Sequence, residues 1–186
     1  MLTCIGDVHH EYRQYLQLVR KSDYTVQVGD MGFDYGALGS LDPNKHVFIG
    51  GNHDNYDILE EAPPSHYLGK YGLKTLNDVE FFYLSGGYSI DRDSRIKRML
   101  LGHPKQWWVQ EELTKEELDN AYFLYCTLKP NIVITHECPR FVADRIGDPD
   151  FLRDWGYNPD TFTTRTSECL QRCWEFHQPK LWVFGH

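Results

Sequence analysis

Several features of membrane-bound and secreted proteins are missing from this sequence of 186 residues. No apolar stretch approaches the roughly 18 residues that a membrane-spanning helix needs. The first residues lead straight into a strand-like segment, without the basic and apolar regions of a secretory signal. Low-complexity runs typical of disordered chains are absent as well. We therefore expect a globular protein of the cytoplasm that has no membrane partner.

Cysteine is sparse, and its pattern does not indicate disulfide bonds. The five cysteines are odd in number and widely scattered, and a chain of this length can bury a core without covalent staples. Cys169 and Cys173 are one helical turn apart, a spacing that could suit a metal, but no second Cys or His pair lies in register with them. We expect reduced thiols that face the core.

Basic residues are fewer than acidic residues in this sequence. The chain has 19 Lys and Arg residues against 27 Asp and Glu residues, which gives a formal net charge of -8, and it contains no basic run. Sequence-independent binding to DNA or RNA depends mainly on basic side chains that neutralise phosphates. Stable nucleic-acid binding is therefore not expected, and a nuclease is a less favoured reading. The net charge of the chain does not predict the electrostatic potential inside a metal site, because bound divalent cations would reverse the negative potential of the acidic side chains there.

The residues that are present indicate one α/β domain over residues 1–186. Hydrophobic residues make up 41 % and aromatic residues 15 % of the chain, with no linker or internal repeat. Short apolar segments alternate with segments of helical periodicity. We expect strands at residues 1–5, 24–28, 46–49, 79–84, 88–90, 131–135 and 180–184, and helices at residues 12–21, from Thr114 onward and at 167–177. Residues 140–164 are expected to form an ordered loop.

Polar side chains follow five of these strands at the point where each strand ends. In α/β folds, ligands gather beyond the carboxyl ends of the strands. An extended backbone after the first strand would point alternate side chains to one side. Each residue alone could be a helix cap, a turn former or a core histidine, but carboxylate, imidazole and amide together suit manganese, iron or zinc. The ordered set favours a two-metal hydrolytic centre, and its members are Asp7, His9, Asp30, Asn52, His136 and His186.

The motifs that contain these residues resemble a known family. The resemblance is to the five signature blocks of the calcineurin-like metallophosphoesterase superfamily, and the blocks span the whole chain. A glycine-rich segment at residues 86–91, followed by Trp107 and Trp108, also resembles small bacterial and bacteriophage members. The implied fold is a four-layer α/β/β/α sandwich in which two packed mixed β-sheets are flanked by helices. The five blocks are Gly6-Asp7-Val8-His9, Gly29-Asp30, Gly51-Asn52-His53-Asp54, Thr135-His136 and Gly185-His186.

The resemblance implies a role for each residue of the set. It implies two divalent metal ions, manganese first and iron or zinc as alternatives. A hydroxide that bridges the metals would attack the phosphorus atom. His53 would stabilise the transition state or protonate the leaving oxygen, and Asp54 would orient the His53 ring. Asp7 and His9 would bind the first metal, Asp30 would bridge both, and Asn52, His136 and His186 would complete the second site.

Three features depart from the pattern of the superfamily. The last block normally continues to a second histidine that serves the first metal, whereas this sequence stops at His186. Either the chain is cut there or the first site lacks one ligand, for which His10 is a conceivable substitute. Asp30 is not followed by the Asp-Arg-Gly of protein serine/threonine phosphatases, and Asp54 stands where that group has glutamate. The last two differences favour phosphodiesterase-like relatives.

Basic and aromatic residues in the middle of the chain are candidates for substrate recognition. Arg92 and Arg95 could hold a phosphate oxygen, or they could belong to a solvated strand edge. His103, Trp107 and Trp108 could form a lid on which a nucleobase stacks, or they could pack over the core. The expected substrate is a phosphorylated small molecule or a nucleotide. The alternatives are a protein serine/threonine phosphatase and a degenerate, non-catalytic metal-binding module.

Overall fold

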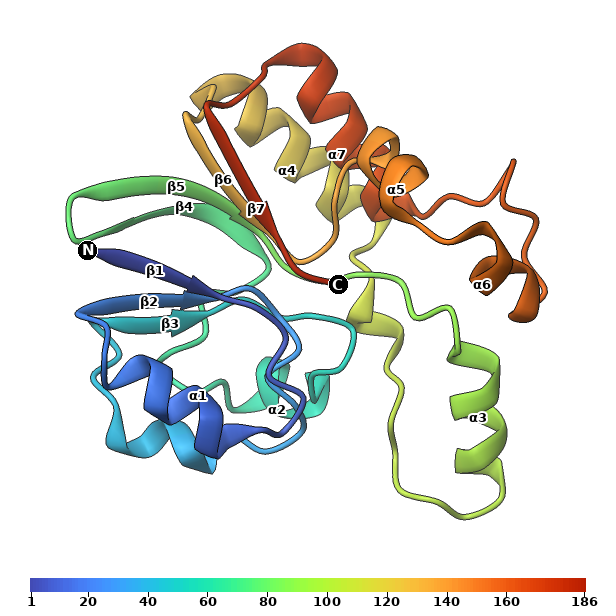
Figure 1. Ribbon diagram of the computed structural model, residues 1–186, viewed down its shortest axis with the longest axis horizontal. Helices are drawn as coiled ribbons and strands as arrows, with labels where there is room; N and C mark the ends of the chain where they lie inside the picture. Colours follow the sequence, from blue (N-terminus) through green and yellow to red (C-terminus); the bar gives the residue numbers. More distant parts are fainter.

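The computed structural model describes residues 1–186 and arranges them in four layers (Figure 1). A three-stranded and a four-stranded sheet pack against each other, and helices cover the outer face of each sheet. The expected α/β/β/α architecture is thereby confirmed. One detail differs, because the three-stranded sheet is wholly parallel and only the four-stranded sheet is mixed. None of the helices has the length and apolar character that a membrane crossing requires.

The three-stranded sheet is built from the first third of the chain. Its strands are β1 (Leu2–Ile5), β2 (Tyr24–Gln27) and β3 (His46–Phe48), in that order. Helices α1 (Tyr12–Val19), η1 (Gly36–Ser40) and α2 (Tyr56–Glu61) lie on its outer side (Figure 1). Because parallel strands run in the same direction, the segments that follow all three strands emerge at one edge of the sheet.

The four-stranded sheet has the order β4-β5-β6-β7. Strands β4 and β5 form an antiparallel hairpin whose turn residues, Asn77 and Asp78, have φ angles of 51° and 59°, as a two-residue hairpin turn requires. Strands β5, β6 and β7 are parallel. The strands are β4 (Tyr71–Leu76), β5 (Val79–Leu84), β6 (Ile132–Thr135) and β7 (Leu181–Phe184), and the covering helices are α4 (Lys115–Leu128) and α7 (Arg165–Phe176).

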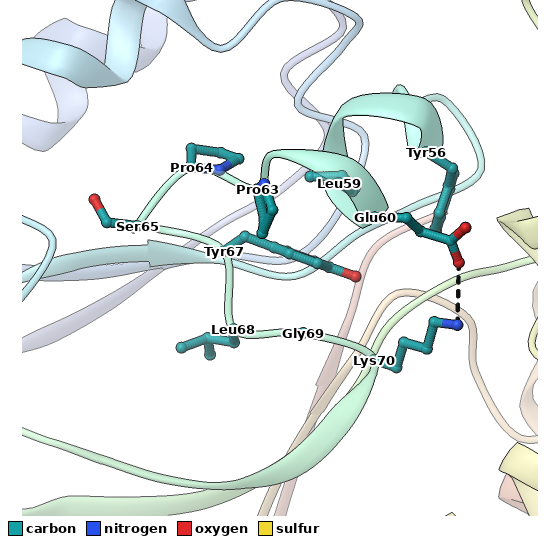
Figure 2. Close-up of a pocket in the computed structure, with 10 residues that line it drawn as sticks. All are labelled: Tyr56, Leu59, Glu60, Pro63, Pro64, Ser65, Tyr67, Leu68, Gly69 and Lys70. Carbon is teal, nitrogen blue, oxygen red and sulfur yellow. Dashed lines mark ion pairs between the residues drawn. The ribbon is translucent and has the colours of Figure 1, made fainter.

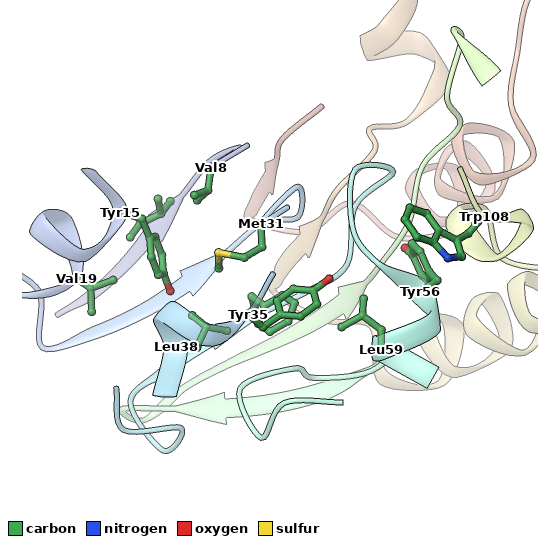
Figure 3. Close-up of a cluster of buried hydrophobic side chains, with 11 residues drawn as sticks. Val8, Tyr15, Val19, Met31, Tyr35, Leu38, Tyr56, Leu59 and Trp108 are labelled. Atoms are coloured by element: carbon green, nitrogen blue, oxygen red, sulfur yellow. The ribbon is translucent and has the colours of Figure 1, made fainter. Parts of the chain in front are cut away.

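Three apolar clusters hold the four layers together. The cluster between the first sheet and its helices includes Tyr15, Met31 and Leu38 (Figure 3). Phe81 and Phe82 are adjacent on β5 and both fully buried, yet Phe81 belongs to the cluster between the two sheets and Phe82 to the one beneath α4 and α7. This follows from the alternation of side chains across a strand. Both faces of the sheet are therefore covered.

Three expected elements were wrong. Residues 88–90 are not a strand, since the partner of β5 is β4. The arginine-rich segment after them is not a strand edge but the helix α3 (Arg92–Leu100). Residues 140–164 contain two helices, α5 (Arg140–Ile146) and α6 (Pro149–Asp154). The start of α6 carries ordinary helix signals, because Pro149 occupies its first turn and Asp148 caps it through the Asp150 amide.

Candidate metal centre

The residues expected as metal ligands converge where the carboxyl ends of the two sheets meet. His136, after β6, places its Nε2 atom 3.0 Å from Asn52 Oδ1 and 3.4 Å from Asp30 Oδ1, both after strands of the other sheet. The backbone amide of His186, after β7, donates to the Asp7 carboxylate at 3.1 and 3.3 Å. The C-terminus marks this place in Figure 1. The structure thus brings the two halves of the candidate set together, and their role as ligands stays a prediction.

Asp30 lies at the middle of the set. Its Oδ1 atom faces His136, while its Oδ2 atom lies 3.4 Å from Nε2 of His9 on the other side. Asp30 is buried, with 2 % of its surface exposed, and its φ of 60° lies in the left-handed region. A non-glycine residue held in that region is strained, a condition that clusters at functional sites. Asp30 therefore has one oxygen toward His136 and the other toward His9, and Oδ1 also accepts the His53 backbone amide at 2.7 Å.

The loop after β1 brings its ligands to the centre in a different way from the one expected. His9 and His10 have φ angles of 44° and 69°, so the backbone is left-handed rather than extended, and the argument from strand alternation was wrong. His9 still faces Asp30. His10 instead packs its ring 5.1 Å from that of Phe33 and lies beside Tyr12. His10 therefore does not face the candidate ligands, and the expectation that it could substitute for one is wrong.

Hydrogen bonds fix which atoms of His136 and Asn52 face each other. His136 Nδ1 lies 2.9 Å from the Val28 carbonyl, which can only accept, so the proton of a neutral ring is on Nδ1 and Nε2 carries a lone pair. The Asn52 Nδ2 atom donates to Ser89 Oγ, and Ser89 donates to Glu111, which leaves Asn52 Oδ1 toward His136. Two acceptors and a carboxylate oxygen thus converge without a donor between them. This arrangement fits a metal cation.

Two glycines are required by close packing at the centre. A Cβ atom on Gly51 would collide with Oδ1 of Asp30, and one on Gly185 would collide with Oδ1 of Asp7. The absence of a side chain at Gly51 and Gly185 therefore leaves room for carboxylates that follow other strands, in the same sheet for Gly51 and in the opposite sheet for Gly185.

Asp54 does not orient the ring of His53 as the resemblance implied. Its carboxylate accepts the backbone amides of Asp30, Gly32 and Gly51 at 3.0, 3.2 and 2.7 Å, together with the Tyr35 hydroxyl at 3.0 Å. These donors occupy both carboxylate oxygens of Asp54. The carboxylate therefore binds backbone amides and the Tyr35 hydroxyl, and not the imidazole of His53. Burial raises the pKa of Asp54 to about 7, against the opposing effect of the Gly51 amide. Asp54 fastens two ligand-bearing loops to each other.

His53 is instead in contact with Arg95, which we had expected to bind substrate. Arg95 Nη2 lies 2.6 Å from His53 Nε2, and Arg95 is only 4 % exposed. Burial lowers the pKa of His53 to about 4. The spacing of Asp91 and Arg95, four positions apart, was a signal for an ion pair at the start of a helix. Arg92 is nearer the surface and pairs with Asp93, so its role toward substrate remains a prediction.

Two residues of this neighbourhood were missed or misread from the sequence. Trp108 does not form an exposed lid, because it is buried and packs 5.4 Å from the ring of Phe33 in the core. Glu111, in the short helix η2 (Val109–Glu111), accepts the Trp108 amide and the Ser89 hydroxyl. Burial raises the pKa of Glu111 to about 8. No sequence pattern links Glu111 to Asn52, since they meet only through the fold.

One cavity lies away from this centre. It measures about 600 Å³ and lies between α2 and the segment that leads to β4 (Figure 2). Its lining includes Tyr56, Tyr67 and Lys70, and Lys70 is paired with Glu60. None of the candidate ligands lines it. A second cavity of about 380 Å³ is lined by Tyr88 and other aromatic and polar residues, and the Tyr88 amide donates to Glu137, which follows His136. Of these two cavities, the second is the one linked to a candidate ligand, through Tyr88 and Glu137.

A four-layer α/β sandwich with carboxylate, amide and imidazole groups at the carboxyl ends of both sheets defines a metallophosphoesterase. The family model described as calcineurin-like phosphoesterase matches residues 1–186, and the chain belongs to that family. Its members are metal-binding hydrolases of phosphoesters. A comparison with curated proteins finds no match.

Proposed function

We propose that this protein is a dinuclear, metal-dependent phosphodiesterase that acts on a small phosphorylated molecule or a nucleotide. The observation that carries the proposal is the position of Asp30, whose two oxygens face His9 on one side and His136 on the other. A single buried carboxylate between two imidazoles is suited to two cations rather than one.

The residues present divide into two ligand groups. Asp7, His9 and Asp30 would hold one cation, and Asp30 would share the other with the amide oxygen of Asn52 and the imidazoles of the second sheet, His136 and His186. Manganese is the first candidate, with iron or zinc as alternatives, because all three accept this mixture of ligands. Two such cations would supply Lewis acidity toward phosphoryl oxygens and lower the pKa of a water molecule to about 7.

The protein's own groups would position the substrate and stabilise developing charge. With its pKa lowered to about 4 by burial, His53 is uncharged at neutral pH. An uncharged imidazole can donate a hydrogen bond to a phosphoryl oxygen, but it is a poor acid for protonating the leaving group. The first of these two roles is therefore favoured for His53. Asp54 contributes indirectly, because it ties the Asp30 and Gly51 backbones together.

The preference for diesters rests on the loop after Asp30. Met31 occupies the first position of that loop and is fully buried in the apolar cluster beneath the first sheet. Residues 31–40 contain no arginine. The Asp-Arg-Gly segment of protein serine/threonine phosphatases supplies an arginine at this place, which could hold the doubly charged phosphate of a monoester. This difference supports a diester substrate over a phosphorylated protein.

Hydrolysis of two artificial substrates tests the proposal. With added Mn²⁺, we expect the protein to cleave bis-p-nitrophenyl phosphate in preference to p-nitrophenyl phosphate. Asp30→Ala and His53→Ala should abolish or strongly reduce cleavage, whereas Glu116→Gln, at an exposed site on α4, should not change it. A monoester preference would favour the phosphatase. Binding of one metal with no cleavage of either compound would favour the non-catalytic module.

A further inference from the structure

The contact between Arg95 and His53 determines where the imidazole carries its proton. A guanidinium group is always protonated and can only donate hydrogen bonds. At 2.6 Å from Arg95 Nη2, the Nε2 atom of His53 must therefore be the acceptor. A neutral imidazole has one N–H group, so in His53 this group is Nδ1–H.

Arg95 is held too firmly to release this contact easily. Its Nε atom pairs with Asp91 at 2.8 Å, and its Nη1 atom donates to the carbonyls of Asn52 and Gln106, each at 3.3 Å. The carboxylate of Glu111 lies 3.8 Å from the same Nη1 atom. The guanidinium is thus surrounded by acceptors from the residue before α3, from η2 and the segment that precedes it, and from the loop after β3. A buried arginine with this many partners has little freedom to turn away.

The position of His53 alone would allow a different role. Side-chain nitrogen and oxygen atoms of His9, Asp30 and His53 lie within 4.8 Å of one another, close enough to hold one metal ion. A histidine ligand needs a nitrogen lone pair. In His53, Arg95 occupies the lone pair on Nε2, and the proton occupies Nδ1.

We propose that Arg95 is a positioning residue that keeps His53 out of the metal coordination sphere and presents its Nδ1–H group to a phosphoryl oxygen of the substrate. The part that concerns substrate rests on the function proposed above. The tautomer of His53 and its exclusion from metal binding do not depend on the proposed function, because both can be observed in the absence of substrate.

The tautomer can be observed directly in the metal-free protein. Long-range ¹H–¹⁵N NMR spectra of ¹⁵N-histidine-labelled protein, with His53 assigned through His53→Ala, should show a protonated Nδ1 and an unprotonated Nε2. Arg95→Gln should remove this preference, and Arg98→Gln, an exposed arginine on the same helix, should leave it intact. A protonated Nε2 in the wild-type protein would overturn the proposal.

Metal binding provides the second readout. In Zn²⁺-loaded wild-type protein, His53 should keep its Nδ1 proton and show no shift typical of a metal-bound nitrogen. Arg95→Gln should bind Zn²⁺ more tightly than wild type, as titration calorimetry would show, and adding His53→Ala to that variant should cancel the gain. General damage to the fold would weaken binding instead, and weaker or unchanged binding in Arg95→Gln would count against the proposal.

The turnover of a diester links the positioning role to catalysis. Arg95→Gln should lower kcat by roughly 10- to 100-fold, the usual cost of losing a group that orients an active-site residue, while KM changes little. Arg95→Lys, which keeps the charge and one donor, should recover part of the loss. If neither wild type nor variant cleaves a diester, the proposed function fails, and the NMR and Zn²⁺ results still decide the tautomer.

Discussion

Asn52 Oδ1 and His136 Nε2 face each other at 3.0 Å, and the hydrogen bonds on their far sides leave no donor between them. Two lone pairs at this distance repel each other, and a divalent cation removes that repulsion. Mn²⁺ should therefore stabilise the folded protein, by about 2.7 kcal/mol at 100 times its Kd. Thermal unfolding with and without Mn²⁺ measures the effect. His136→Ala should lose most of it, and Glu116→Gln should retain it.

The hydroxyl of Ser89 selects the orientation of the Asn52 amide. Ser89→Ala removes the acceptor of Asn52 Nδ2 and the donor to Glu111, so the amide is free to rotate. We expect metal affinity to fall by roughly 10-fold or more, as for other groups that orient a ligand. Titration calorimetry with Mn²⁺ checks this expectation. Ser89→Thr keeps the hydroxyl and should bind nearly as well as wild type; equal weakening in both variants would indicate a packing effect.

The four donors around Asp54 predict a large effect of a small change. Asp54→Asn keeps the size of the side chain but replaces one acceptor oxygen with a donor, which would face buried backbone amides. An unsatisfied buried donor costs about 1–3 kcal/mol. Urea denaturation should show a loss of at least this size, accompanied by lower diester turnover. Full stability in Asp54→Asn would refute the role assigned to this carboxylate.

The raised pKa of Glu111 predicts how stability depends on pH. Burial raises this pKa from 4.5 to about 8, so between these values the folded state keeps a proton that the unfolded state releases. The contribution of Glu111 to stability is therefore greatest below about pH 4.5 and falls as pH rises toward 8. Glu111→Gln mimics the protonated form. Its unfolding free energy relative to wild type, from denaturant curves, should increase between pH 5 and 8, and a constant difference would contradict the pKa.

The sequence was sufficient to predict which residues gather at the ends of the strands because their positions follow from local pattern, while their role as metal ligands stays a prediction. His136 directly follows β6, and Asp30 comes three positions after the end of β2. Parallel strands of one sheet end at a common edge. The sequence also indicated the layers, through alternating strand and helix periodicity. What it could not show was how the two edges face each other, since the packing of one sheet on the other brings together residues more than 100 positions apart, such as Val28 and His136.

The contacts that hold the candidate ligands in place were harder to predict. Asp54 follows His53 directly, yet adjacent residues here point in different directions, so proximity in sequence was misleading. Arg95 contacts His53 across 42 positions, and its helix was mistaken for a strand edge because charged residues dominate it. Ser89 and Glu111 form a hydrogen bond that depends on the path of two loops. Loop paths have no periodicity from which they could be predicted.

The hydrogen bond between the His186 amide and Asp7 has a consequence for the order of folding. It joins positions 179 residues apart, and His186 reaches this place only when β7 is paired with β6. The first sheet can pair its three strands without β7, but Asp7 and His186 cannot meet until β7 is in position. If these residues hold a cation, its binding would depend on the pairing of β7 and would serve as a readout of that pairing.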